Sequence, residues 1–115
     1  MTGAKMKRVE ILYFGSCPGW QATLQRVREV VAREGLDSSV SIKTLSVETD
    51  EQAQERRFLG SPTVRVDGRD IDPTSTESTS FGLQCRVYQH QGRLDRLPSE
   101  DLIRRALGVG GSPCP

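Results

Sequence analysis

VEILYFGSCPGW, residues 9–20, is the stretch that decides the fold. Its first six residues form a β-branched and aromatic run with one charge, Glu10, which is typical of a β-strand. A Gly-Ser pair interrupts the run. Cys17 then takes the position of a helix N-cap, and Pro18 fits the first helical position, where a missing N–H costs nothing. The stretch therefore predicts a thiol on a strand-to-helix turn.

Beyond this turn, Leu24, Val27 and Val31 recur at helical spacing until Gly35 ends the helix. A thiol at the positive end of a helix ionises easily, and its pKa falls from ~8.5 to roughly 3.5–7.5. The alternative is a small buried cysteine that only packs. A Cys-Pro pair that opens a helix directly after an apolar strand favours a functional thiol at Cys17.

Length and charge limit the possible functions. The chain has 115 residues, 16 basic and 15 acidic side chains and a formal net charge of +1. This size suits one compact domain, and the balanced charge argues against nucleic acid or an anionic membrane as a partner. We expect a disordered lead-in at 1–7, one domain at 8–108 and a flexible tail at 109–115.

The N-terminal residues contain no apolar leader segment, so the sequence predicts a cytoplasmic protein in which thiols are kept reduced. The cysteines are Cys17, Cys85 and Cys114, and the one histidine is His90. They are too far apart in the sequence for a disulfide framework or a zinc ligand set. We therefore expect neither a bound metal nor a cofactor.

The middle of the chain alternates between extended and helical patterns. Residues 39–47 read as a strand whose apolar phase switches between Ile42 and Leu45, which implies a bulge or a strand buried on both faces. Thr49 and Gln52 resemble a capping box that opens a short helix through residue 58, closed by Gly60.

A hairpin and a last helix complete the domain. Residues 63–66 and 69–72 flank an Asp-Gly turn, and a polar loop covers 72–80. Residues 83–88 are extended, and 89–96 are polar. Ser99 caps a helix whose inner face is apolar, and Gly108 ends it. This order predicts an α/β layer sandwich, with a four-stranded mixed sheet and helices on both faces.

This element order, together with Cys17-Pro18-Gly19-Trp20, Pro62 and the Val-Asp-Gly turn at 66–68, resembles the thioredoxin-like superfamily, nearest to its short glutaredoxin-like forms. YFGSCP, GSPTVRVDGRD and GLQCRVY also resemble small bacterial thioredoxin-like proteins, some with selenocysteine at the thiol position and some labelled alkylmercury lyase. The resemblance implies a cis Ser61–Pro62 bond beside Cys17. It also implies substrate contacts at four residues, namely Trp20, Ser61, Pro62 and Thr63.

The chain departs from this family in two respects. Dithiol members have a second cysteine where this chain has Trp20, so no disulfide can close within the motif. The basic residue before the motif and the Gly-Gly-Asp turn that serve glutathione in glutaredoxins are also missing. Trp20 itself has two interpretations, either packing on the inner face of the helix or forming a wall beside the thiol.

Cys85 has two interpretations as well. The polar loop before it is long enough to return it to Cys17, as a resolving thiol requires. Alternatively, Cys85 faces the core between Leu83 and Val87, which share its strand phase. Cys114, in the tail, is predicted to be an exposed thiol without a role.

Three functions fit these observations. In the first, Cys17 is the attacking thiol of a monothiol-type thiol–disulfide oxidoreductase, resolved by a small thiol such as glutathione or by Cys85. In the second, Cys17 and Cys85 handle a soft metal or an organomercurial, with Asp70 or Asp72 as proton donor. In the third, a redox-inactive module binds a peptide in the groove at Pro62. We expect a monomer or a weak dimer.

Overall fold

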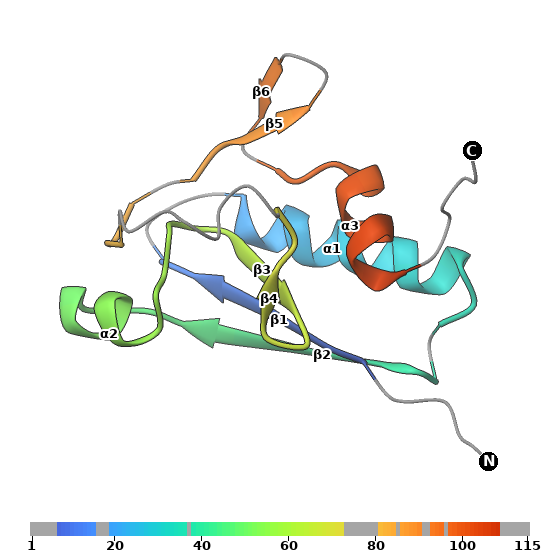
Figure 1. The fold of residues 1–115 in the computed structure, drawn as a ribbon, viewed down its shortest axis with the longest axis horizontal. Helices are drawn as coiled ribbons and strands as arrows, with labels where there is room; N and C mark the ends of the chain where they lie inside the picture. The colour runs from blue at the N-terminus through green and yellow to red at the C-terminus, as the bar shows by residue number, and fades with distance from the viewer. Residues whose placement is uncertain are drawn as a thin grey trace.

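The computed structural model describes residues 7–15, 19–36, 38–72, 81–84, 86–90, 93–95 and 97–108. Its helices and strands, in chain order, are β1 (Lys7–Tyr13), α1 (Trp20–Arg33), β2 (Val40–Ser46), α2 (Asp50–Glu55), β3 (Thr63–Val66), β4 (Arg69–Asp70), β5 (Tyr88–His90), β6 (Arg93–Asp95) and α3 (Glu100–Leu107) (Figure 1). Of the lead-in predicted at 1–7, residues 1–6 lie outside the described residues, as does the tail at 109–115, while Lys7 already belongs to β1.

The main sheet has four strands in the order β2-β1-β3-β4. β1 pairs in parallel with β2 and antiparallel with β3, and β3 pairs antiparallel with β4. This mixed topology confirms the predicted α/β class with a thioredoxin-like layer sandwich. β5 and β6 form a separate two-stranded sheet, drawn at the top of Figure 1, which the sequence analysis did not predict.

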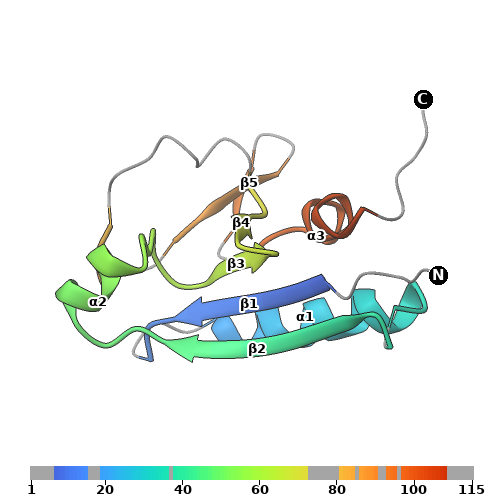
Figure 2. The same ribbon diagram turned by 60° about the horizontal axis from the view of Figure 1, so that its bottom comes forward.

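The two faces of the sheet carry two separate cores, because successive residues of β1 point to opposite faces. Val9 and Ile11 pack with buried residues of α1 and α3, whereas Leu12 packs with Ala53 and Phe58 at α2. Figure 2 shows α2 at the end of the sheet where β1 and β2 finish, well away from α3. Helices therefore cover both faces, as predicted.

The packing of β2 explains why the apolar residues of its sequence change from one face of the strand to the other. Val40 and Ile42 belong to the α1 and α3 core, while Leu45 and Val47 belong to the α2 core. The pairing with β1 is continuous from Val40 to Ser46, without a bulge. Each half of the strand thus packs its apolar residues against a different core, and β2 shows neither a bulge nor burial on both faces along its length.

Several helix ends follow the predicted capping residues. The Thr49 and Ser99 hydroxyls accept hydrogen bonds from the third residue beyond each, at 3.0 and 3.1 Å, and Gly108 ends α3 in a left-handed conformation. α2 stops at Glu55, earlier than predicted, because Arg57 adopts a positive φ of 55°.

The predicted start of α1 is wrong. The N-cap is Gly19 rather than Cys17, and the helix begins at Trp20. Gly19 has a φ of 104°, which is outside the helical region, so the helix cannot extend through it. Its carbonyl accepts the first helical hydrogen bond, from the Thr23 N–H at 3.0 Å.

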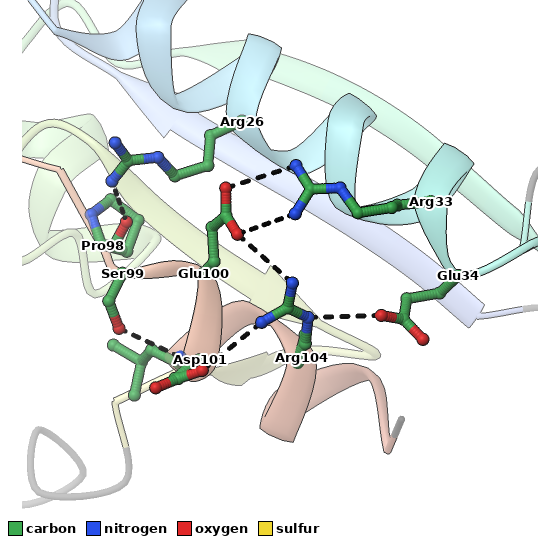
Figure 3. A network of polar contacts seen from close by, with 9 residues as sticks. Arg26, Arg33, Glu34, Pro98, Ser99, Glu100, Asp101 and Arg104 are labelled. Carbon is green, nitrogen blue, oxygen red and sulfur yellow. Dashed lines mark hydrogen bonds and ion pairs between the residues drawn. The ribbon is translucent and has the colours of Figure 1, made fainter. Parts of the chain in front are cut away.

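A polar network fixes α3 against α1 (Figure 3). The Glu100 carboxylate accepts two hydrogen bonds from Arg33, at 3.0 and 3.4 Å, and one from Arg104 at 3.3 Å. Arg104 also contacts Glu34 and Asp101. The hydrogen bond from Arg33 lowers the pKa of Glu100 below its ordinary value.

We predict that Glu100→Gln lowers the melting temperature slightly at neutral pH. A carboxylate whose pKa is depressed by folding contributes stability above its unfolded pKa and loses it as the pH falls through its folded pKa. The difference from wild type should therefore close on acidification, as thermal unfolding followed by circular dichroism can show. The exposed Glu55→Gln is the control and should leave the melting temperature unchanged at neutral pH. A constant gap at all pH values would contradict the assignment.

Candidate functional site

The carboxyl end of β1 and the start of β3 lie side by side. Leu12 is the register partner of Thr63, so the chain leading to residues 16–18 leaves the sheet next to the chain arriving from Pro62. The Ser61–Pro62 peptide bond is cis, as the resemblance implied. Cys17, Cys85 and Cys114 themselves lie outside the described residues.

The sequence neighbours of Cys85 are bound to the residue before Pro62. The Ser61 N–H donates to the Gln84 carbonyl at 2.8 Å, and the Arg86 N–H donates to the Ser61 carbonyl at 2.9 Å. The segments on either side of Cys85 are therefore held at the end of the sheet from which the Cys17 turn departs.

Gly60 makes this close approach possible. A Cβ atom at Gly60 would lie 3.0 Å from both the Arg86 Cβ and the Gln84 carbonyl oxygen. Its φ of +125° is also a conformation that side chains rarely adopt. The sequence pattern predicts Gly60 as the end of a helix, because a glycine in a sequence does not reveal which neighbour requires it.

The predicted substrate contacts at Ser61, Pro62 and Thr63 are buried. Their backbone also bonds within the chain, since the Pro62 carbonyl accepts from the Tyr88 hydroxyl at 2.6 Å. The Thr63 hydroxyl donates to the Gly60 carbonyl, also at 2.6 Å. Burial raises the pKa of the Tyr88 hydroxyl far above its ordinary value, so it remains a hydrogen-bond donor.

A buried ion pair between Arg86 and Asp70 lies beside the chain at Pro62. Both guanidinium nitrogens of Arg86 contact the Asp70 carboxylate, at 2.7 and 2.9 Å, and the Arg86 and Asp70 side chains are only 8% and 11% exposed. Arg86 also donates to the Thr63 hydroxyl at 3.3 Å and lies 4.4 Å from the centre of the Tyr88 ring. Burial lowers the pKa of Arg86, but the Asp70 hydrogen bond and nearby charges leave it above its ordinary value.

The predicted alternation of the Cys85 segment, in which Leu83 and Val87 face the core, does not agree with the structure. Val87, which was expected to face the core, is 55% exposed, while Arg86 and Tyr88 are buried. The residues that share the phase of Cys85 are thus not all on the core side. Sequence patterns missed Arg86 because a charged side chain in an extended segment normally marks the solvated face.

Trp20 is in neither core cluster. Its ring stacks on Tyr13 with the ring centres 3.9 Å apart and the planes 14° from parallel. Both side chains are partly exposed. Tyr13 is the last residue of β1 and Trp20 the first of α1, so the stack joins the two ends of the turn that contains Cys17. Trp20 precedes the buried Thr23 and Val27 by three and seven positions and its ring packs on β1, so it lies on the inner face of α1, the first of its two interpretations.

The N-terminus of α1 has no side-chain cap and no acidic residue in its first turn. Within α1 itself, neither the N-cap nor the first turn therefore supplies a side chain that compensates the positive end of its dipole. Such a terminus favours a nearby anion. Cys17 precedes the Gly19 N-cap by two positions in the sequence.

The model of one protein family, described as Domain of unknown function (DUF2703), matches residues 9–107. The chain belongs to this family. The DUF2703 match contains Cys17 and Cys85 and excludes Cys114. Neither the curated proteins nor the solved structures include a match. None of the helices in the described part of the chain has the length and apolar character needed to cross a membrane.

Proposed function

We propose that this protein is a thiol–disulfide oxidoreductase in which Cys17 is the attacking thiol and Cys85 the resolving thiol. One observation carries the proposal: Gln84 and Arg86, on either side of Cys85, are both hydrogen bonded to Ser61. Ser61 lies beside the carboxyl end of β1, where the chain continues to Cys17. The described neighbours of two thiols 68 positions apart in the sequence therefore lie at one end of the sheet.

The proposed reaction is an ordinary exchange. The Cys17 thiolate attacks one sulfur of a substrate disulfide, forms a mixed disulfide and releases the other half as a thiolate. The Cys85 thiolate then attacks the Cys17 sulfur, releases the second half, and leaves a Cys17–Cys85 disulfide. Two equivalents of a small thiol such as glutathione reduce this disulfide and are themselves oxidised to a disulfide.

Three further features support this assignment. The uncapped N-terminus of α1 favours a thiolate nearby. Val87, in the strand phase of Cys85, is exposed rather than part of the core. The partly exposed Trp20, stacked on Tyr13, offers a substrate an aromatic surface at the same turn.

The two other functions suggested by the sequence have less support. A peptide bound at Pro62 would need free backbone groups, but the Ser61 and Pro62 carbonyls already accept hydrogen bonds within the chain. Organomercurial cleavage would need a proton donor, and of the two candidates, Asp70 and Asp72, the first has both carboxylate oxygens occupied by hydrogen bonds from Arg86.

The proposed chemistry also specifies the surroundings of the protein. Small thiols regenerate Cys17 only in a reducing compartment, which agrees with a cytoplasmic location. The proposed partners are a disulfide substrate and a small thiol. Because the reaction needs only the thiols of one chain, a monomer or a weak dimer suffices, without cofactor or nucleic acid.

Oxidation followed by alkylation tests the proposal. One equivalent of a mild oxidant should remove the Cys17 and Cys85 thiols together and leave Cys114 free for iodoacetamide, as peptide mass spectrometry can measure. Cys17→Ser should leave Cys85 and Cys114 both free under the same conditions. Cys114→Ser is the matched control and should form the disulfide normally.

Two results would contradict the proposal in different ways. If Cys17 reacts with iodoacetamide no faster than Cys114 at neutral pH, its role as attacking thiol is excluded. If Cys17 is fast but is converted to a stable sulfenic acid or a small-thiol adduct while Cys85 stays free, the resolving role of Cys85 is excluded.

A further inference from the structure

A pocket of about 320 Å³ lies between the β3–β4 hairpin and α3. Val66 and Ile71 contribute buried apolar surface to it, and Leu102 and Ala106 of α3 contribute half-buried surface. Ligand pockets in proteins usually span ~300–1,000 Å³ and are mostly apolar with a few polar groups. The pocket therefore has the size and apolar lining that suit a small organic molecule.

Two exposed arginines, Arg69 of β4 and Arg105 of α3, line the same pocket. Neither guanidinium makes a hydrogen bond or ion pair with another residue of the described part of the chain. Arg104, next to Arg105, differs because its guanidinium contacts three carboxylates (Figure 3). The two pocket arginines thus keep their donors for another partner.

The acidic residue of the pocket does not cancel this charge. Asp70 accepts two hydrogen bonds from Arg86, so that the two charges neutralise each other. Arg69 and Arg105 leave an excess of positive charge at the opening, which favours an anion. A planar guanidinium also matches the geometry of a carboxylate, to which it can donate two parallel hydrogen bonds.

The pocket opens away from the proposed thiol site, although Asp70 both lines the pocket and pairs with Arg86 beside the Cys85 segment. Val66 pairs with Val9 near the beginning of β1, whereas Thr63 pairs with Leu12 near its end. An occupant of the pocket therefore lies toward the opposite end of the sheet from the Cys17 turn. We propose that this pocket binds a small organic carboxylate with an apolar body, its carboxylate at Arg69 and Arg105 and its apolar body against Val66, Ile71, Leu102 and Ala106.

Hexanoate is a suitable probe, and binding to the full chain can be followed by the amide ¹H–¹⁵N shifts of the pocket residues. We expect saturable shifts at Val66, Ile71 and Ala106. Hexanol, which lacks the charge, should bind at least about tenfold more weakly, because hydrogen bonds to charged groups are the stronger ones. Acetate, which lacks the apolar body, should also bind at least about tenfold more weakly, because apolar burial contributes to affinity.

Variants distinguish the contribution of the pocket's charge to hexanoate binding from the contribution of its shape. The double variant Arg69→Gln/Arg105→Gln should weaken hexanoate binding by about tenfold or more. Ala106→Leu, which reduces the volume while keeping both charges, should also weaken it. Arg28→Gln removes an exposed arginine of α1 outside the pocket and should leave the affinity unchanged.

Three results would overturn the proposal: equal affinities for hexanoate and hexanol, equal affinities for hexanoate and acetate, or the same loss in Arg28→Gln as in the double variant. An unchanged spectrum outside the pocket shows that each variant is folded. None of these readouts depends on the cysteines, so the pocket and the thiol chemistry can fail independently.

Discussion

Arg86→Leu should lower the free energy of unfolding by about 3–5 kcal/mol, the usual cost of removing one partner of a buried ion pair. The reason is the Asp70 carboxylate, only 11% exposed, which would lose both hydrogen bonds at 2.7 and 2.9 Å. The Thr63 hydroxyl and the Tyr88 ring would lose a contact as well. Urea unfolding followed by circular dichroism measures the difference.

The double variant Asp70→Asn/Arg86→Leu is the informative partner of this experiment. It should recover part of the lost stability, because no isolated buried charge remains. Arg33→Leu is the matched control, since it breaks an ion pair to Glu100 whose arginine is half exposed. Surface pairs contribute little, so its effect should be much smaller. Equal losses in Arg86→Leu and Arg33→Leu would show that burial does not determine the cost.

The parts of the fold that the sequence predicted correctly depend on local chemistry. The apolar run of β1, the Asp67-Gly68 turn and the Ser99 cap each follow from a few adjacent residues. The turn has positive φ at both central residues, 53° and 84°, as a two-residue hairpin requires. Together they were enough for the mixed sheet, because the order of such elements leaves few topologies.

The features that the sequence did not predict depend on distant partners. Arg86 is buried because Asp70, sixteen positions earlier, neutralises it, and no periodic pattern carries that information. The start of α1 was missed because Pro18 suits a first helical position, while Gly19 is compatible with almost any conformation. The β5–β6 hairpin has a mostly polar sequence and resembled a loop.

In the candidate site too, some residues were predictable from the sequence and others were not. Position in the motif pointed to Cys17 and Trp20, and the resemblance pointed to Pro62. The roles of Gly60, Asp70, Arg86 and Tyr88 in holding the segment around Cys85 become visible only in three dimensions.

Gly60→Ala should destabilise the protein by about 2–5 kcal/mol, from strained backbone together with an overpacked contact. The new methyl group would lie 3.0 Å from the Arg86 Cβ and from the Gln84 carbonyl oxygen, tighter than nine in ten real Cβ contacts. To relieve this contact, the segment around Cys85 has to move away from Ser61. Urea unfolding gives the loss of stability.

Gly68→Ala is the control that distinguishes the cost of backbone strain from the cost of a steric clash. Gly68 also has a positive φ, +84°, but nothing lies within 4 Å of its hypothetical Cβ, so it should lose only about 1–2 kcal/mol. The proposed function adds a second readout. Because Gly60→Ala displaces the neighbours of Cys85, it should slow formation of the Cys17–Cys85 disulfide under native conditions, while Gly68→Ala should not. Equal rates in the two folded variants would mean that the hydrogen bonds at Ser61 do not position Cys85 for exchange.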